Sequence, residues 1–229
     1  MCGRFALFAS PELLAEYFAL TDFDQAALAP HYNVTPGQDV AAVRIDREGK
    51  RRLKALRWGL VPFWAKDASI GRRLVNARLD GLSSKPAFRE ALTRRRCLIA
   101  ASGFYEWGEA RPGARQPFFV RPRHDPLLAL AGLWERWRSP DGSTLESCVI
   151  VTTEANALLA PIHDRMPLMV ARADHDRWLD PATTTSSIAD LAARGPDLAA
   201  WPVGKAVNDP RNDDEKLIEP LVGESATTS

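Results

Sequence analysis

Four apolar runs between residues 97 and 154 most restrict what this chain can fold into. They are rich in β-branched and aromatic residues and are separated by glycine and proline, a pattern typical of β-strands. The runs are CLIAASGFYEW, QPFFVRP, PLLALAGLWERW and ESCVIVTTE. Helical patterns are interspersed with them irregularly, without a βα repeat. The sequence therefore predicts an α+β fold with a mixed, largely antiparallel β-sheet or barrel-like core and flanking helices.

The remaining segments give local predictions. Residues 11–20 predict a short helix, with Ser10 as N-cap and Pro11 at the first helical position. VAAVRID and RLKALRWGL predict a β-hairpin that turns at Glu48-Gly49. SSIADLAARG predicts a helix and WPVGKAVN a late strand.

No repeat, linker or low-complexity tract interrupts residues 1–222, so we expect one compact domain there and a polar tail over residues 223–229. No run approaches the roughly 18 apolar residues of a membrane span, and the first residues lack the pattern of a signal peptide. We therefore expect a cytoplasmic monomer with no membrane partner.

The three cysteines show no CxxC or metal-ligand spacing, which indicates a reducing compartment and no metal. Cys97 and Cys148 lie in apolar strand patterns and are expected in the core. The net charge of +1 argues against a globally cationic nucleic-acid binder. Clusters such as Arg94–Arg96 are either solvated surface or part of one cationic groove for a short stretch of phosphate backbone.

The start of the chain, MCGRF, places a cysteine at a position that we expect not to be buried, since chain termini are hard to bury. If Met1 is removed, Cys2 carries a free α-amine and a thiol on adjacent carbons. Their reference pKa values are about 7.7–8.0 and about 8.5. Gly3 allows a close approach to a ligand. Either Cys2 is incidental, or its terminal position is functional.

Two further positions suggest acid–base chemistry. Glu106 lies between two aromatic residues at the end of an apolar strand, where burial raises a carboxyl pKa and suits a general acid or base. The alternative is a strand-end glutamate facing solvent. His163 lies in the loop PIHDRMP, where it is either functional or hydrogen-bonded within a turn. The other histidines, His31, His124 and His175, are expected at the surface.

Asn76 and Arg78 alternate along VNAR and are expected on one face of an extended segment, where they could orient a substrate and grip a phosphate. The alternative is a turn-forming asparagine and a surface arginine. The tryptophans of RWGLVPFWAKD are either packed at the core and its rim or exposed to stack on bases.

Seven stretches occur in one order along the chain: MCGRF, YNVTPGQ, RWGLVPFWAKD, NARLDGLSSKPAFRE, CLIAASGFYEW, PIHDRMP and VNDPRND. In this combination the sequence resembles the SRAP (SOS-response-associated peptidase) family, proteins that shield abasic sites in single-stranded DNA. The resemblance extends over about residues 1–222. MCGRF, FYEW and HDRMP are its most specific parts, whereas the tryptophan segment alone would be weak evidence.

The resemblance implies an enzyme that crosslinks itself to abasic DNA, with lyase-like or peptidase-like chemistry and no cofactor or metal. After removal of Met1, the Cys2 amine would attack the ring-opened aldehyde, and the thiol would close a thiazolidine ring. His163 would act as acid and base on the sugar, Glu106 would move protons at the amine, and Asn76 would position Cys2. Met1 would be removed autocatalytically or by an aminopeptidase.

The resemblance also implies residues that contact single-stranded DNA. Arg4, Arg78 and Arg165 are candidate phosphate clamps, Asn33 would shape the pocket, and Trp64 or Trp107 would stack beside the lesion. The protein would then associate with the nucleoid when it engages DNA. Sequence preference should be weak, because the sugar rather than a base is read.

Two alternatives stay open. Glutamine amidotransferases also begin near Met-Cys-Gly and use the terminal cysteine as nucleophile, although Gly3 is followed here by Arg-Phe. A module that binds single-stranded or modified DNA without covalent chemistry would use the same arginines and tryptophans but would not need Cys2.

Overall fold

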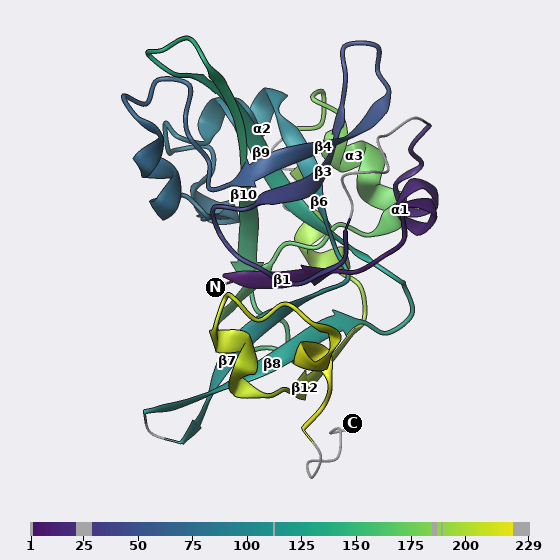
Figure 1. Cartoon of the computed structure of the whole chain (residues 1–229). Coiled ribbons are helices and arrows are strands. Elements are labelled where there is room, and N and C mark those ends of the chain that lie inside the picture. Colours follow the sequence, from purple (N-terminus) through teal and green to yellow (C-terminus); the bar gives the residue numbers. More distant parts are fainter. Residues whose placement is uncertain (1, 22–28, 112, 185–186, 189, 222–229) are drawn as a thin grey trace.

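The four apolar runs form the centres of two β-sheets in the computed structural model of this chain (Figure 1). The structure describes residues 2–21, 29–111, 113–184, 187–188 and 190–221. Met1 and the predicted tail, residues 223–229, lie outside the described residues. No described helix is long and apolar enough to cross a bilayer.

The first sheet has the strand order β12-β8-β7-β1-β2, and every pairing in it is antiparallel. Its central strands β7 and β8 form a long hairpin below β1 in Figure 1. The strands span Arg4–Leu7 (β1), His31–Val34 (β2), Gly103–Arg111 (β7), Ala114–Pro122 (β8) and Leu198–Pro202 (β12).

The second sheet has the order β11-β10-β4-β3-β6-β9, and a further pairing of β9 with β10 closes it into a barrel. Strand β10 pairs in parallel with β4 and β5, and the other pairs are antiparallel. The predicted mixed, largely antiparallel core is confirmed. The strands are Asp39–Ile45 (β3), Arg51–Trp58 (β4), Asn76–Arg78 (β5), Arg96–Ala101 (β6), Leu128–Arg138 (β9), Thr144–Glu154 (β10) and Arg165–Pro167 (β11).

Short α-helices flank the sheets, among them α1 (Pro11–Phe18), α2 (Arg89–Arg94) and α3 (His175–Leu179). As predicted, Ser10 caps α1, because its Oγ accepts a hydrogen bond from the backbone N–H of Leu13 at 3.2 Å. The β3–β4 hairpin also forms as predicted, with Gly49 at φ 77° in the turn. Cys97 and Cys148 are both fully buried in the core.

Some local predictions need correction. CLIAASGFYEW is not one strand: the chain leaves β6 at Ser102 and enters β7 in the other sheet. The late strand β12 ends at Pro202, and Lys205–Asn208 forms a 3-10 helix instead. Of the predicted helix SSIADLAARG, Ser186 and Ala189 lie outside the described residues, and Asp190–Arg194 is a 3-10 helix.

The expectation that His175 lies at the surface is wrong, because its side chain is fully buried. Its ring stacks on Phe18 of α1 with ring centroids 5.4 Å apart. Burial and the nearby positive charge of Arg51 lower the pKa of His175 to about 4. The polar sequence around His175 is misleading because the short helix α3 turns His175 inward together with Trp178 and Leu179. His31 and His124 are exposed as expected.

Candidate active site

Strand β1 places Cys2 between the two sheets. β1 pairs with β7 so that Arg4 lies opposite Tyr105, and it pairs with β2 on its other edge. Cys2 has no exposed surface and belongs to the main apolar core. The expectation that this position cannot be buried is therefore wrong. The physical reason is that β1 is an inner strand, so the residues that lead into it are covered from both sides.

Burial controls the protonation of Cys2. Desolvation and the negative charge of Glu106 raise the pKa of the Cys2 thiol to about 12. The thiol is therefore neutral at pH 7, and its Sγ lies 3.9 Å from the Arg4 carbonyl oxygen.

Asn76 holds the backbone of residue 2. Its Nδ2 donates a hydrogen bond of 2.7 Å to the Cys2 carbonyl oxygen. Asn76 is placed there by β5, which pairs in parallel with β10, with Asn76 opposite Ile150. Ala77 is buried on the other face of this strand. Asn76 thus holds the main chain of Cys2 and does not contact the thiol through this hydrogen bond.

Glu106 is buried, with 3% of its surface exposed. Its Oε1 accepts a hydrogen bond of 3.3 Å from the Trp107 backbone N–H. Of the two alternatives left by the sequence, a solvent-facing glutamate and a buried one, the structure has the buried one. A carboxyl group in such surroundings can exchange a proton with a neighbouring amine without competition from bulk water.

His163 lies at the edge of a pocket of about 390 Å³ and shares its lining with Trp107 and Ile162. The His163 side chain is 23% exposed, and its Nδ1 lies 2.8 Å from Asp164 Oδ1. The backbone N–H of Arg165 also donates to this nitrogen at 3.0 Å. Two neighbouring residues, Asp164 and Arg165, therefore fix the orientation of the His163 ring through Nδ1.

Arg165 and Arg78 come from β11 and β5, two strands that each pair with β10. Arg165 Nη2 donates to the Thr152 carbonyl oxygen at 2.8 Å, which anchors its guanidinium on β10. Arg78 is exposed and forms a two-point ion pair with Asp80, with Nη2 2.7 Å from Asp80 Oδ2. Register places Arg78 opposite Thr152, so both arginines lie beside one residue of β10.

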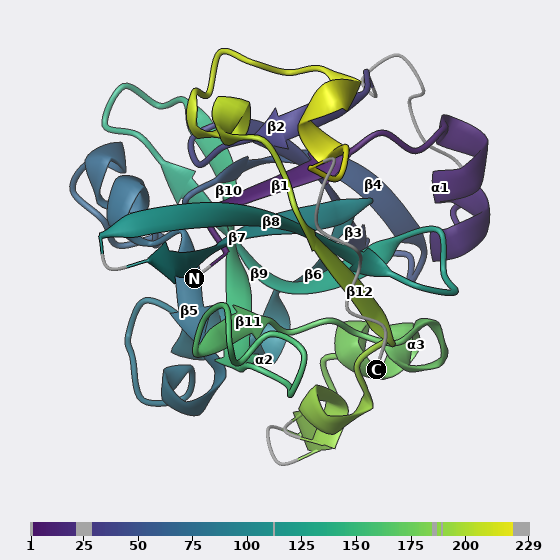
Figure 2. The same cartoon turned by 90° about the horizontal axis from the view of Figure 1, so that it is seen from below.

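Arg4 and Asn33 form a buried polar cluster with the C-terminal segment. Arg4 Nη1 donates to Asn33 Oδ1 and to the Val207 carbonyl oxygen, both at 2.7 Å. Asn33 Nδ2 in turn donates to the carbonyl oxygens of Val207, Asp209 and Asn212. This cluster ties β1, which carries Cys2, to the segment that covers the first sheet (Figure 2).

The two tryptophans proposed to stack beside the lesion, Trp107 and Trp64, lie in different parts of the molecule. Trp107 is partly buried, with Nε1 donating to Asn208 Oδ1 at 2.8 Å and the Arg4 guanidinium 5.9 Å from its ring centroid. Trp64 follows β4 and is 49% exposed beside Phe63. No hydrogen bond joins Trp64 to the other site residues within the described chain, so the structure groups Trp107, but not Trp64, with Cys2 and Arg4.

The sequence profile of the family described as SOS response associated peptidase (SRAP) matches residues 1–210. The chain belongs to the SRAP family.

SRAP relatives cover the chain almost fully. "Abasic site processing protein YoqW" of Bacillus subtilis is 39% identical over 223 residues, 96% of this chain and 99% of the relative. "Abasic site processing protein HMCES" of Gallus gallus is 29% identical and covers 96% of this chain, which corresponds to 78% of that protein. A crystal structure of a Bacteroides thetaiotaomicron protein has the same fold, with a TM-score of 0.86, 23% identity and coverage of 96% and 100%.

Sequence reasoning missed residues that support this SRAP site. Thr152 anchors Arg165, Asp80 pairs with Arg78, and Asp213 accepts hydrogen bonds from the backbone N–H groups of Tyr32 and Asn33. VNDPRND was noted as a motif without a structural role. Thr152 gave no usable signal, because it lies within an apolar strand pattern.

Within the described part of the chain, no group of three or more histidine, cysteine, aspartate or glutamate side chains is arranged to hold a metal ion. The functional groups of these residues are the Cys2 thiol and the buried Glu106 carboxyl group, with the His163 imidazole in the neighbouring pocket and several guanidinium groups around them.

Proposed function

We propose that this SRAP protein binds single-stranded DNA and that Cys2, once Met1 is removed, forms a covalent thiazolidine with the ring-opened aldehyde of an abasic site. The observation that carries the proposal is the hydrogen bond of 2.7 Å from Asn76 to the Cys2 carbonyl oxygen. It fixes the main chain of residue 2, and with it the α-nitrogen, in the surroundings of Glu106. Relatives named abasic site processing proteins support the substrate class.

The reaction balances without a cofactor. The α-nitrogen of Cys2 adds to the aldehyde carbon, and the resulting carbinolamine loses water to give an iminium ion. The thiol sulfur then adds to the same carbon, and its proton is released, which leaves a neutral five-membered ring containing nitrogen and sulfur. The second addition is intramolecular, so it benefits from proximity. One water molecule is the only product besides the crosslink.

The neighbouring side chains suit the proton transfers. Glu106 takes the proton from the Cys2 ammonium group and later returns protons to the intermediates, including in slow reversal. His163 donates and accepts protons at the sugar oxygen, and its contacts with Asp164 and Arg165 hold the imidazole ring in place. The carboxyl and imidazole groups therefore act on different parts of the substrate.

The guanidinium groups suit the DNA backbone. Arg78 is exposed and Arg165 is anchored beside it, so their free N–H groups are available to phosphate oxygens. Arg4 acts through its contacts with Asn33 and Val207, which hold β1 in place. Trp107 supplies an aromatic surface beside the lesion, and Trp64 supplies a second one further along the strand.

The same residues also suggest how Met1 is removed. Cys2, Glu106 and His163 form the set that an autocatalytic cleavage would use, and an aminopeptidase is the alternative. The mass of purified Glu106→Gln distinguishes them, because only autocatalysis requires Glu106.

The amidohydrolase alternative is less well supported than abasic-site chemistry. The curated relatives are named abasic site processing proteins. Release of glutamate from glutamine by the purified protein would favour the hydrolase instead.

Denaturing gels test the proposal. Wild-type protein incubated with abasic single-stranded DNA should give a shifted band that survives SDS and heat. Cys2→Ser should give no durable band, because ring closure by oxygen is far less favourable. Cys97→Ser is the matched control, since Cys97 is equally buried but lies in β6, and it should crosslink normally. A durable band from Cys2→Ser would contradict the proposal, and retained binding without any crosslink in the wild type would favour a non-covalent module.

A further inference from the structure

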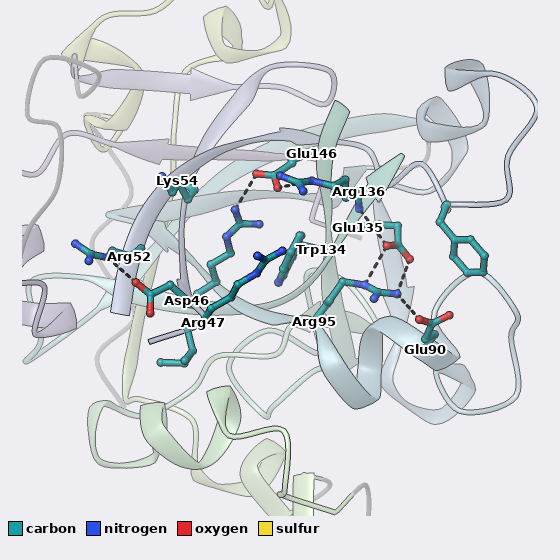
Figure 3. Close-up of a pocket in the computed structure, with 13 residues that line it drawn as sticks. Asp46, Arg47, Arg52, Lys54, Glu90, Arg95, Trp134, Glu135, Arg136 and Glu146 are labelled. Carbon is teal, nitrogen blue, oxygen red and sulfur yellow. Dashed lines mark hydrogen bonds and ion pairs between the residues drawn. The ribbon is translucent and has the colours of Figure 1, made fainter. Parts of the chain in front are cut away.

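A second concave site lies at the other end of strand β10. It is a groove of about 730 Å³ between the β3–β4 hairpin and the start of the β9–β10 hairpin, which we call the Trp134 groove (Figure 3). Glu146 of β10 lines it, whereas Arg165 of the candidate active site is anchored at Thr152. Six residues of strand separate the two positions, about 20 Å.

Cross-strand register brings the charged residues of the groove together. Arg44 lies opposite Arg52 in the β3–β4 pair, and Arg136 lies opposite Glu146 in the β9–β10 pair. Paired residues point to the same side of a sheet. Of the described residues that line the groove, six are basic and four are acidic. The groove is therefore cationic in a protein whose net charge is only +1.

Arg44 is held flat at the base of the groove. Its guanidinium carbon lies 3.9 Å from the centroid of the Trp134 ring, and its Nη2 donates to Glu146 Oε2 at 2.8 Å. Its other terminal nitrogen, Nη1, is buried and makes no hydrogen bond with any described residue. Arg136 Nε approaches the same Glu146 carboxylate at 3.2 Å, so one carboxylate serves two guanidinium groups.

The rim adds charge that is not neutralised. Arg47 and Lys54 are exposed, and within the described chain neither makes an ion pair or a side-chain hydrogen bond. Phe63, 53% exposed, lines the same groove. Figure 3 shows Arg47 and Lys54 on the side of the β3–β4 hairpin, across from Arg136 and Glu146.

We propose that the Trp134 groove binds a nucleotide. The Arg44 guanidinium, backed by the Trp134 ring, offers a flat cationic surface on which a base stacks. Arg47, Lys54 and Arg136 face the phosphate group. The volume is within the range of small-ligand sites. A nucleotide combines the aromatic plane and the negative charge that these two features require, whereas an acidic peptide would leave the stacking surface unused.

The nucleotide has two possible sources, a free nucleotide and the flanking part of a DNA strand engaged near Cys2. Both present the same base and phosphate chemistry. A strand long enough to cross the distance between the two sites would reach the groove, and a dinucleotide would not.

Binding measurements test the proposal with a matched pair of variants. Arg47→Ser/Lys54→Ser removes both unpaired rim charges and breaks none of the ion pairs described above. Arg94→Ser/Arg138→Ser removes two exposed basic residues that do not line the groove. Isothermal titration with AMP, ATP, inorganic phosphate, a short and a long oligothymidylate, and an oligoglutamate peptide compares the wild type with both variants.

We expect AMP or ATP, the long oligonucleotide, or both to bind the rim variant about tenfold or more weakly than the control variant. If only AMP or ATP binds the rim variant more weakly, the ligand of the groove is a free nucleotide. If the long but not the short oligonucleotide binds it more weakly, the ligand is part of the DNA strand. Equal affinities of both variants for every nucleotide probe would overturn the proposal, as would a groove that binds only phosphate or only oligoglutamate. Crosslinking to a short abasic oligonucleotide should be unchanged in both variants, which keeps this test separate from that of the proposed function.

Discussion

The Cys2 site and the Trp134 groove lie toward opposite ends of strand β10 and expose their polar groups to water to different degrees. Cys2 and Glu106 are at most 3% exposed, and the thiol is held in its neutral form. In the groove, Arg136 is 63% exposed and shares a partly exposed carboxylate with Arg44. At the Cys2 site, burial thus sets the protonation state of the thiol. In the Trp134 groove, the ion pairs are in contact with water, so the guanidinium charges remain available to a ligand. The first arrangement suits chemistry and the second suits binding.

The largest expected effect concerns the amine. Inserting an alanine that remains ahead of Cys2 converts the Cys2 amine into an amide, so durable crosslinking should fall by a factor of about 100 or more. The alanine amine can still form a reversible imine, but it has no thiol on the adjacent carbon to close the ring. Gel assays on protein whose N-terminus is verified by mass spectrometry measure this. The control carries the same alanine after residue 229 and should react normally. Normal crosslinking by the N-terminal variant would show that the buried site does not work through the amine.

The next effect concerns the polar cluster that supports the buried site. Asn33→Ala removes the hydrogen bonds to three carbonyl oxygens and to Arg4, and should lower the free energy of unfolding by about 2–4 kcal/mol. Urea denaturation measures the change. Asn212→Ala is the control, because its side chain makes one exposed hydrogen bond, to the Ala206 carbonyl oxygen, and should cost less than about 1 kcal/mol. If both variants lost the same free energy of unfolding, the buried position of Asn33 would not strengthen its contribution to stability.

His175 tests burial of an ionisable group away from both sites. Its pKa is about 4 in the folded protein, against about 6.5 in the unfolded chain. Between these values the unfolded chain binds more protons, so stability should fall as pH drops from about 6.5 to about 4, by about 3 kcal/mol in total.

The comparison of pH–stability profiles isolates this contribution. His175→Gln should lack the His175 part of the slope, whereas His124→Gln, at an exposed position, should keep it. Parallel wild-type and His175→Gln profiles over this range would refute the account of His175.

The smallest effect concerns the groove. Arg136→Ala removes one of two guanidinium groups on Glu146 and should lower stability by about 0.5 kcal/mol, less at high salt, because the pair is exposed. Thermal unfolding with and without added salt measures this, with Arg138→Ala as control. A loss of several kcal/mol would make the groove a structural ion-pair network rather than a binding site.

The sequence predicts local features well and long-range ones poorly. The α1 cap at Ser10, the hairpin turn at Gly49 and the burial of Cys97 depend on residues close in the chain. The burial of Cys2 depends on β1 entering between β2 and β7, and that of His175 on packing against α1. Neither can be seen in a local pattern.

The Cys2 site and the Trp134 groove also differ in how far they can be predicted from short sequence motifs. Asn76, Glu106 and His163 could be proposed from the sequence because each lies in a distinctive short motif. The groove could not, because only strand register brings Arg44, Arg136 and Glu146 together. The support that Asn33 gives to the C-terminal segment was missed for the same reason.

Intact mass spectrometry of the protein after incubation with an abasic oligonucleotide tests the central claim most directly. We predict one species that survives heating and whose mass equals the protein without Met1 plus the oligonucleotide minus one water molecule. Cys2→Ala, whose amine can form only a reversible imine, should leave no such species after heating. Finding Cys2 at the N-terminus but no adduct, or the same adduct with Cys2→Ala, would contradict the account.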